Sequence, residues 1–274
     1  MSAPVKAAAL AILIVAAPLG AWGAKGHRIA SALALRTLPR EPRAWFEGRE
    51  DYLLDHASDP DRWGLHDPKE KRRHFINTET YGGPEGVPFD QEEARAMVGG
   101  REFYAAGQAP WIIQDRWRDL VGAFRAGNRE QVALAAAALG HYVADLHVPL
   151  HTTRNHDGQE TGQRGVHARW ESSLVERFVE EGELKVAPAE DLPEGDVAPW
   201  GWMKESNALL PQLLADDREA EKSGLGRRKG AYWQVFGSLE GAVVKRQLER
   251  SGQRFGDLIL MAWEKAGRPA APKA

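Results

Sequence analysis

Hydrophobic positions along most of this chain recur with the period of an α-helix. In the range 130–147, Ala136, Leu139 and Val143 fall on one broad face, and Pro149 follows soon after. Side chains three or four residues apart share one face of a helix, and proline does not continue a helix. This stretch therefore predicts a buried helix that ends before Pro149.

The same period recurs elsewhere, and almost no segment alternates in the manner of a β-strand. It predicts a helix that begins close to Trp22, another that begins near Val166, and helices at 200–215, 231–236 and 240–263. We therefore expect an all-α fold, with one multi-helix domain at 22–266 and a disordered tail at 267–274.

Long irregular stretches separate these helices. They lie at 59–83 and 151–165, and a third segment at 187–199 is rich in Pro, Glu and Asp. Long ordered loops inside a compact domain are more often functional than accidental. We expect the first two to surround a functional cleft.

The first 21 residues predict a secretory signal peptide. One lysine precedes an apolar run at 7–17, and small residues follow up to Ala21. The run is too short to span a bilayer as a helix, and its ending resembles a cleavage site. We expect cleavage between Ala21 and Trp22, which would release a secreted or periplasmic protein. An uncleaved membrane anchor is the alternative.

Composition and charge exclude several classes of function. Of the 274 residues, 43% are hydrophobic, which is enough for a sizeable core. The formal net charge is −3, or −4 once the leader and its single lysine are removed. Such a chain has no broad basic surface for nucleic acid, so any phosphate contact must be local or made through a metal. The absence of cysteine excludes disulfides and thiolate metal ligands.

The region between residues 141 and 171 carries two pairs of a histidine and a carboxylate. His141 and Asp145 form one pair, His167 and Glu171 form the other, and His151 lies between them. Residues four apart lie one turn apart on the same helix face, where an imidazole and a carboxylate can bind one metal ion. Two such pairs with a third histidine predict a site for more than one metal.

Further nitrogen and oxygen donors lie towards the N-terminus. After cleavage Trp22 would carry a free α-amino group, and His27 follows it closely. Asp61 and His74 lie in the first long irregular stretch. Nitrogen and oxygen donors of these kinds suit zinc.

Together these residues lie in motifs that resemble, in the same order, the metal-binding motifs of the fungal single-strand-specific nucleases. Those enzymes belong to one superfamily with the bacterial zinc-dependent phospholipases C. The motifs are Trp22-Gly23-x-x-Gly26-His27, Ala57-Ser58-x-x-Asp61, His74-Phe75-Ile76, His141-x3-Asp145-x3-Pro149-Leu150-His151 and His167-x2-Trp170. Near the end of the chain, the segment Gly241-Ala242-Val243-Val244, then Gln247-Leu248, Gly252 and Arg254, is similar to the nucleases' last helix.

The resemblance implies a cluster of three zinc ions and the hydrolysis of phosphate esters. By this resemblance one zinc takes Asp61, His74, His141 and Asp145, a second takes His151, His167 and Glu171, and a third takes the amine and carbonyl of Trp22 with His27 and Asp145. Asp145 would bridge two ions, and Asp61 could also orient or deprotonate the attacking water. We expect these two carboxylates to be catalytic.

Three residues near the ligands are candidates for substrate binding. Phe75 stands where the nucleases have an aromatic side chain that stacks on a base, although a buried core Phe is the alternative. Asn77 stands where they have a base-binding Asp, and it can both donate and accept hydrogen bonds. Arg62 could contact phosphate. The charged run at 69–73 is instead typical of a solvated face.

The motifs are a mixture of the two enzyme types. Glu171 gives the His-x3-Glu form of the phospholipases, whereas the close spacing of Trp22 and His27 is the nuclease form. We expect an exported trizinc phosphodiesterase that acts as a monomer, with single-stranded DNA or RNA, or nucleotides as for a 3′-nucleotidase, as its first substrate class. A phospholipase C that acts on phospholipid head groups is the second reading. An exported metal-binding protein without turnover is the third.

Overall fold

A computed structural model describes residues 22–193, 195–223 and 229–273. Within these ranges the chain is mostly helical and contains no β-strand. The one extended pairing among them is an isolated bridge between Ile76 and Gly107. The expected all-α class is confirmed, and the predicted signal peptide at 1–21 lies outside the described residues.

The described helices vary greatly in length. The α-helices are α1 (Ala24–Thr37), α2 (Arg40–Arg43), α3 (Glu50–Asp55), α4 (Asp59–Trp63), α5 (Gln91–Val98), α6 (Gly100–Ala106), α7 (Ala109–Ala126), α8 (Arg129–Leu146), α9 (Val166–Ala168), α10 (Leu174–Phe178), α11 (Ala198–Asn207), α12 (Leu210–Glu221) and α13 (Gly230–Lys265). Short 3-10 turns lie at Ala44–Phe46, Glu70–Arg72, Thr78–Tyr81, Pro84–Gly86, Pro149–Thr152, Glu181–Glu183 and Gly195–Val197, and a π-helical turn lies at Arg169–Ser173. None of the described helices is both long and apolar enough to cross a bilayer.

Local sequence signals account for the bounds of α8. The Asn128 side chain accepts hydrogen bonds from the backbone N–H groups of Glu130 and Gln131, at 3.0 and 3.1 Å. Such a cap satisfies donors that have no partner within the helix. Pro149 follows the last turn and begins a separate 3-10 turn. The helix predicted for this stretch is confirmed.

Proline and glycine explain two differences from the predicted helices. The range 200–215 forms two helices, α11 and α12, because Pro211 occupies the first turn of α12 and disfavours a helical conformation just before it. By contrast, α13 runs without a break through Gly237. A Cβ atom there would lie 2.5 Å from the Phe178 ring, so this glycine allows a close helix contact and does not end the helix.

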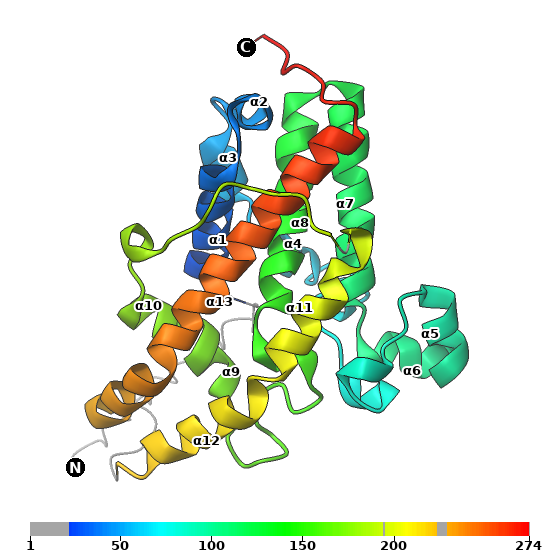
Figure 1. Ribbon diagram of the computed structural model, residues 1–274. Coiled ribbons are helices and arrows are strands. Elements are labelled where there is room, and N and C mark those ends of the chain that lie inside the picture. Colours follow the sequence, from blue (N-terminus) through cyan, green and yellow to red (C-terminus); the bar gives the residue numbers. More distant parts are fainter. Residues whose placement is uncertain (1–21, 194, 224–228, 274) are drawn as a thin grey trace, which may run out of the picture.

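The longest helix, α13, crosses the whole molecule and packs along α1 and α8 (Figure 1). Two glycines bring α13 close to α1. A Cβ atom on Gly252 would lie 2.4 Å from Cβ of Leu33, and one on Gly256 would lie 1.9 Å from Oγ1 of Thr37. The crossing therefore requires residues without a side chain on α13. It fixes the helix that carries His27.

Two groups of buried hydrophobic residues meet at the end of α8. One is built mainly on α7, α8 and the last third of α13, and it includes Tyr142 and Leu146. The other is built on α1, α10, α12 and the first half of α13, and it includes Ala144. His141 and Asp145 therefore lie where the two groups join. The α5 and α6 helices project to one side of this bundle (Figure 1).

The segment that follows α13 has no regular structure up to residue 273. The Pro269 carbonyl nevertheless accepts hydrogen bonds from the indole N–H groups of Trp45 and Trp263, at 3.0 and 2.9 Å. These bonds hold the first residues of the predicted tail against the core.

Candidate metal centre

The last two turns of α8 place His141 and Asp145 in the interior. Both side chains are fully buried, and Nε2 of His141 lies 3.3 Å from Oδ2 of Asp145. The other ring nitrogen, Nδ1, donates to the Ala57 carbonyl at 2.9 Å. That bond leaves the lone pair of Nε2 directed towards Asp145, as a metal ligand requires.

Asp61 on α4 and His74 approach the same point from the first long loop. Nδ1 of His74 lies 2.9 Å from Oδ2 of Asp145 and 3.0 Å from Nε2 of His141. Oδ1 of Asp61 lies 3.8 Å from Nδ1 of His74 and 3.7 Å from Nε2 of His141. We refer to Asp61, His74, His141 and Asp145 as the quartet.

The N-terminal motif lies against the quartet. The His27 ring stacks on that of His141 with centroids 4.0 Å apart, and its Nε2 lies 3.5 Å from Oδ1 of Asp145. The Trp22 indole donates to the Ala144 carbonyl at 2.6 Å and is fully buried. Gly26 is needed here, because a Cβ atom on it would meet the Trp22 side chain at 3.0 Å. His27 is thus brought to Asp145, and the Trp22 indole is held at the backbone of the preceding residue, Ala144.

A second group of donors consists of His151, His167 and Glu171, which we call the trio. Nε2 of His167 lies 3.0 Å from Oε2 of Glu171, and Nε2 of His151 lies 3.6 Å from the same oxygen. Glu171 lies in the π-helical turn, a local widening often found at functional sites. Nδ1 of His151 donates to the His74 carbonyl, which joins the trio to the quartet.

Several atoms of these side chains are buried without a hydrogen bond among the described residues. They are Oδ1 of Asp145, Nε2 of His151, both ring nitrogens of His167 and Oε2 of Glu171. Buried polar atoms are normally hydrogen-bonded, so five exceptions in one place require an explanation. Each is an atom that can ligate a metal. The structure therefore contains buried His, Asp and Glu clusters that could hold a metal ion.

The protonation states of the quartet histidines fit metal binding. Burial lowers the pKa of His141 well below its ordinary value, and the neighbouring His27 and His74 lower it further. Burial also lowers the pKa of His74, in spite of the nearby Asp61 carboxylate. Both rings are therefore neutral near pH 7, the form that binds metals. In Glu171 burial alone would raise the pKa, but the charge of His167 outweighs it and the pKa falls to about 2.

The three candidate substrate residues lie at the edge of this centre. Phe75 is half-buried, and the Arg72 guanidinium lies 6.0 Å from the centre of its ring. Asn77 is also half-buried. Arg62 is largely exposed, and one of its guanidinium nitrogens lies 3.2 Å from Oδ1 of Asp59. All three belong to the segment that carries Asp61 and His74.

The charged run at 69–73 is not wholly solvated, so that prediction is wrong for Glu70. This side chain is buried, and its carboxylate accepts hydrogen bonds from the Tyr142 hydroxyl and the Arg73 guanidinium. Sequence reasoning assigned no role to Glu70 or Tyr142. The available signal was their position, since Glu70 precedes His74 by four residues and Tyr142 follows a ligand directly.

Two other histidines near the ligands in sequence lie outside the donor groups found among the described residues. The buried His147 ring bonds to the Val143 carbonyl at 2.7 Å and to the Arg254 guanidinium at 2.9 Å. The His156 ring is exposed, with its centre 6.4 Å from that of His167. His147 therefore links α8 to α13, and His156 lies at the rim of the trio.

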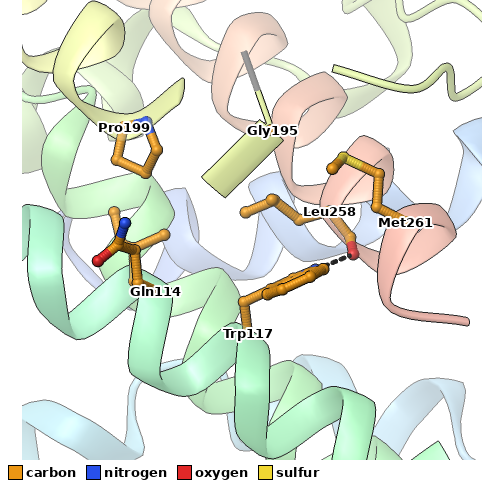
Figure 2. Close-up of a pocket in the computed structure, with 7 residues that line it drawn as sticks. Gln114, Trp117, Gly195, Pro199, Leu258 and Met261 are labelled. Carbon is orange, nitrogen blue, oxygen red and sulfur yellow. Dashed lines mark hydrogen bonds between the residues drawn. The ribbon is translucent and has the colours of Figure 1, made fainter. Parts of the chain in front are cut away.

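A small apolar hollow between α7, α11 and α13 is unrelated to these ligands (Figure 2). Trp117 forms one wall and donates a hydrogen bond of 3.1 Å to the Leu258 carbonyl. Its volume of about 10 Å³ is at most enough for one water molecule. It is a packing defect of the core and not a substrate site.

In comparisons with known proteins, no family model matches the chain, and no curated protein shows significant sequence similarity to it.

Proposed function

We propose that this protein is an exported phosphodiesterase that uses three zinc ions, with single-stranded DNA or RNA as its first substrate class. The observation that carries the proposal is the convergence of the quartet and the trio at one buried place. Asp145 lies between two histidines there: its Oδ1 is 3.5 Å from Nε2 of His27, and its Oδ2 is 2.9 Å from Nδ1 of His74.

The distances within both groups fit zinc. Two ligand atoms bound about 2.0–2.2 Å from one tetrahedral ion lie roughly 3.3–3.6 Å from each other. Ligand atoms in the quartet are separated by 2.9 to 3.8 Å, and those of the trio by 3.0 and 3.6 Å. Small side-chain adjustments would bring either group to ideal distances. Only oxygen and nitrogen atoms contribute, which suits zinc.

The two aspartate ligands differ in how far their side chains are exposed to solvent, which suits them to different roles. Bound zinc ions would lower the pKa of water to about 7 and stabilise negative charge on phosphoryl oxygens. Asp61 is the most exposed ligand side chain, at 22%, so it can orient a water molecule or accept its proton. Asp145 is fully buried, which suits it to hold two ions at a fixed separation. The neutral quartet histidines, His74 and His141, bind without adding charge.

The segment after His74 provides a surface for a base beside these ligands. Phe75 is half-buried, so part of its ring is accessible for stacking. Asn77 lies two residues further on, and its amide can donate to and accept from a base edge. Arg62 is exposed and could contact phosphate. Stacking accepts any base, which agrees with a nuclease of low sequence preference.

A phospholipase C activity is the second candidate, and a groove beside α11 favours it. The groove has a volume of about 500 Å³, and its walls include Phe89 and Met97, which are 55% and 58% exposed. Lys204, in the wall of the groove, lies about one helical turn before Asn207 on α11. The Asn207 amide donates a hydrogen bond to the carbonyl of Thr152, the residue after the proposed ligand His151. The lining is mixed, since Glu85, Glu93 and Lys204 share it with the apolar residues, and only the apolar part of the wall would hold part of a lipid.

Two substrates and two variants separate these candidates. The purified protein, loaded with zinc, would be assayed for hydrolysis of single-stranded DNA and of phosphatidylcholine, with and without a chelator. Phe75→Ala should lower DNA cleavage by roughly 5- to 150-fold, the equivalent of one lost stacking contact, and affect lipid cleavage less. Phe89→Ala is the matched control, and it should show the opposite preference if lipid is the substrate.

The outcomes are distinct. Chelator-sensitive cleavage of DNA with a selective loss in Phe75→Ala supports the nuclease. Cleavage of lipid with a selective loss in Phe89→Ala supports the phospholipase instead. Zinc binding with turnover of neither substrate would contradict both and would identify a metal-binding protein.

A further inference from the structure

Glu70 is a buried carboxylate that touches the quartet without belonging to it. Its side chain is 2% exposed, although it lies in a run of charged residues. Its carboxylate accepts hydrogen bonds from the Tyr142 hydroxyl and from Arg73. Oε1 of Glu70 also lies 3.7 Å from Nε2 of His74. A buried charge is costly unless it is paired, so this arrangement requires a specific compensation.

The hydrogen bond from Tyr142 connects two separate parts of the centre. Tyr142 follows His141 on α8, whereas Glu70 lies in the loop that carries His74. The Tyr142 ring is also close to both histidine rings, with centroids 5.4 Å from each. The bond therefore fixes the segment that carries His74 to the helix that carries His141 and Asp145.

The His74 ring presents a different nitrogen to each side. Its Nδ1 faces Asp145 and His141, while its Nε2 faces Glu70. A histidine that binds a metal through Nδ1 must carry its proton on Nε2. A carboxylate beside Nε2 favours that tautomer and fixes the plane of the ring. At 3.7 Å the two atoms are too far apart for a hydrogen bond, so Glu70 acts on the neutral ring through its negative charge.

We propose that Glu70, held by Tyr142, is a positioning residue that orients His74 for binding of a zinc ion by the quartet. The proposal rests on the zinc centre of the proposed function. It assigns to the quartet a supporting carboxylate that the trio does not share. Loss of the Glu70 charge should therefore weaken zinc at the quartet only.

The test compares zinc binding by the wild type and by Glu70→Gln, which keeps the shape of the side chain and removes its charge. A chromophoric chelator would compete for zinc, and the ring NMR signals of His74 and His151 would report the quartet and the trio separately. We expect zinc affinity at the quartet to fall about 10- to 100-fold, with the trio unchanged. Tyr142→Phe keeps the charge but removes one of the two hydrogen bonds that hold the carboxylate, and it should give a smaller loss at the same site.

Asp257→Asn is a matched control, because this buried carboxylate bonds to Gln253 and to the backbone of Glu190 and to none of the ligands. It should leave zinc binding unchanged. Equal quartet affinity in Glu70→Gln and the wild type would overturn the proposal. If Glu70→Gln does not fold, an unchanged affinity in Tyr142→Phe would overturn it. A wild type that binds no zinc would refute the proposed function itself, which is a different result.

Discussion

Replacing Glu240 with glutamine should stabilise the protein above pH 7, although the change removes a buried carboxyl group that is hydrogen-bonded. Glu240 is 1% exposed and accepts a hydrogen bond of 2.7 Å from the Trp170 indole. Burial raises the pKa of the Glu240 carboxyl to about 7, and the adjacent Asp216 carboxyl contributes. Trp170 directly precedes Glu171, so the pair lies next to the candidate metal centre.

The direction of the effect follows from proton binding. The folded protein binds this proton more tightly than the unfolded chain, in which the ordinary value of 4.5 applies. The resulting stabilisation is fully present below pH 4.5 and is lost as the pH rises through about 7. The difference corresponds to about 3 kcal/mol. A glutamine carries no charge at any pH, still accepts from Trp170 and can donate to Asp216.

Urea unfolding of the metal-free proteins at several values between pH 5 and pH 8 provides the assay. The free energy of unfolding of Glu240→Gln, minus that of the wild type, should rise by about 2.5 kcal/mol across this range, most of the full effect. Glu176→Gln, on the exposed side of α10, is the control and should show no such rise. Parallel pH dependences in Glu240→Gln and the wild type would refute the reasoning.

Three further predictions concern the helix crossing and the metals. Gly252→Ala should destabilise the fold by about 1–3 kcal/mol, because the new Cβ atom would meet Leu33, whereas Gly241→Ala, with no atom within 4 Å, should stabilise it by about 1 kcal/mol. Thermal unfolding of the two variants tests this, and shifts of the same sign would contradict it. Asp145→Asn should bind fewer zinc ions than the wild type and lose phosphodiesterase activity, as measured by metal analysis and hydrolysis; full zinc content would exclude a bridging role. Free zinc at 100 times its dissociation constant should stabilise the fold by about 2.7 kcal/mol and raise the melting temperature by roughly 5–11 °C, and a melting temperature unaffected by chelator would argue against a structural contribution from metal.

Helices defined by local signals were predictable from the sequence, and helices shaped by distant contacts were not. The periodic face of α8 and the proline after it both act within a few residues. Gly237 misleads because glycine usually weakens a helix, while here it accommodates the Phe178 ring from a segment distant in sequence. A local pattern carries no information about such a contact.

The same distinction holds in the candidate metal centre. Spacing alone placed His141 with Asp145 and His167 with Glu171, because helical geometry fixes residues four apart. The role of Glu70 depends on Tyr142, which lies far along the chain on another element. Within a charged run its carboxylate looked solvated, and only the tertiary fold buries it.

The number of zinc ions bound to the mature, purified chain tests the central claim most directly. Metal analysis, combined with N-terminal sequencing, should find three zinc ions per chain in a protein that begins at Trp22. A chain that retains no zinc after incubation with an excess of the metal would contradict the account, since the buried quartet and trio would then need another explanation.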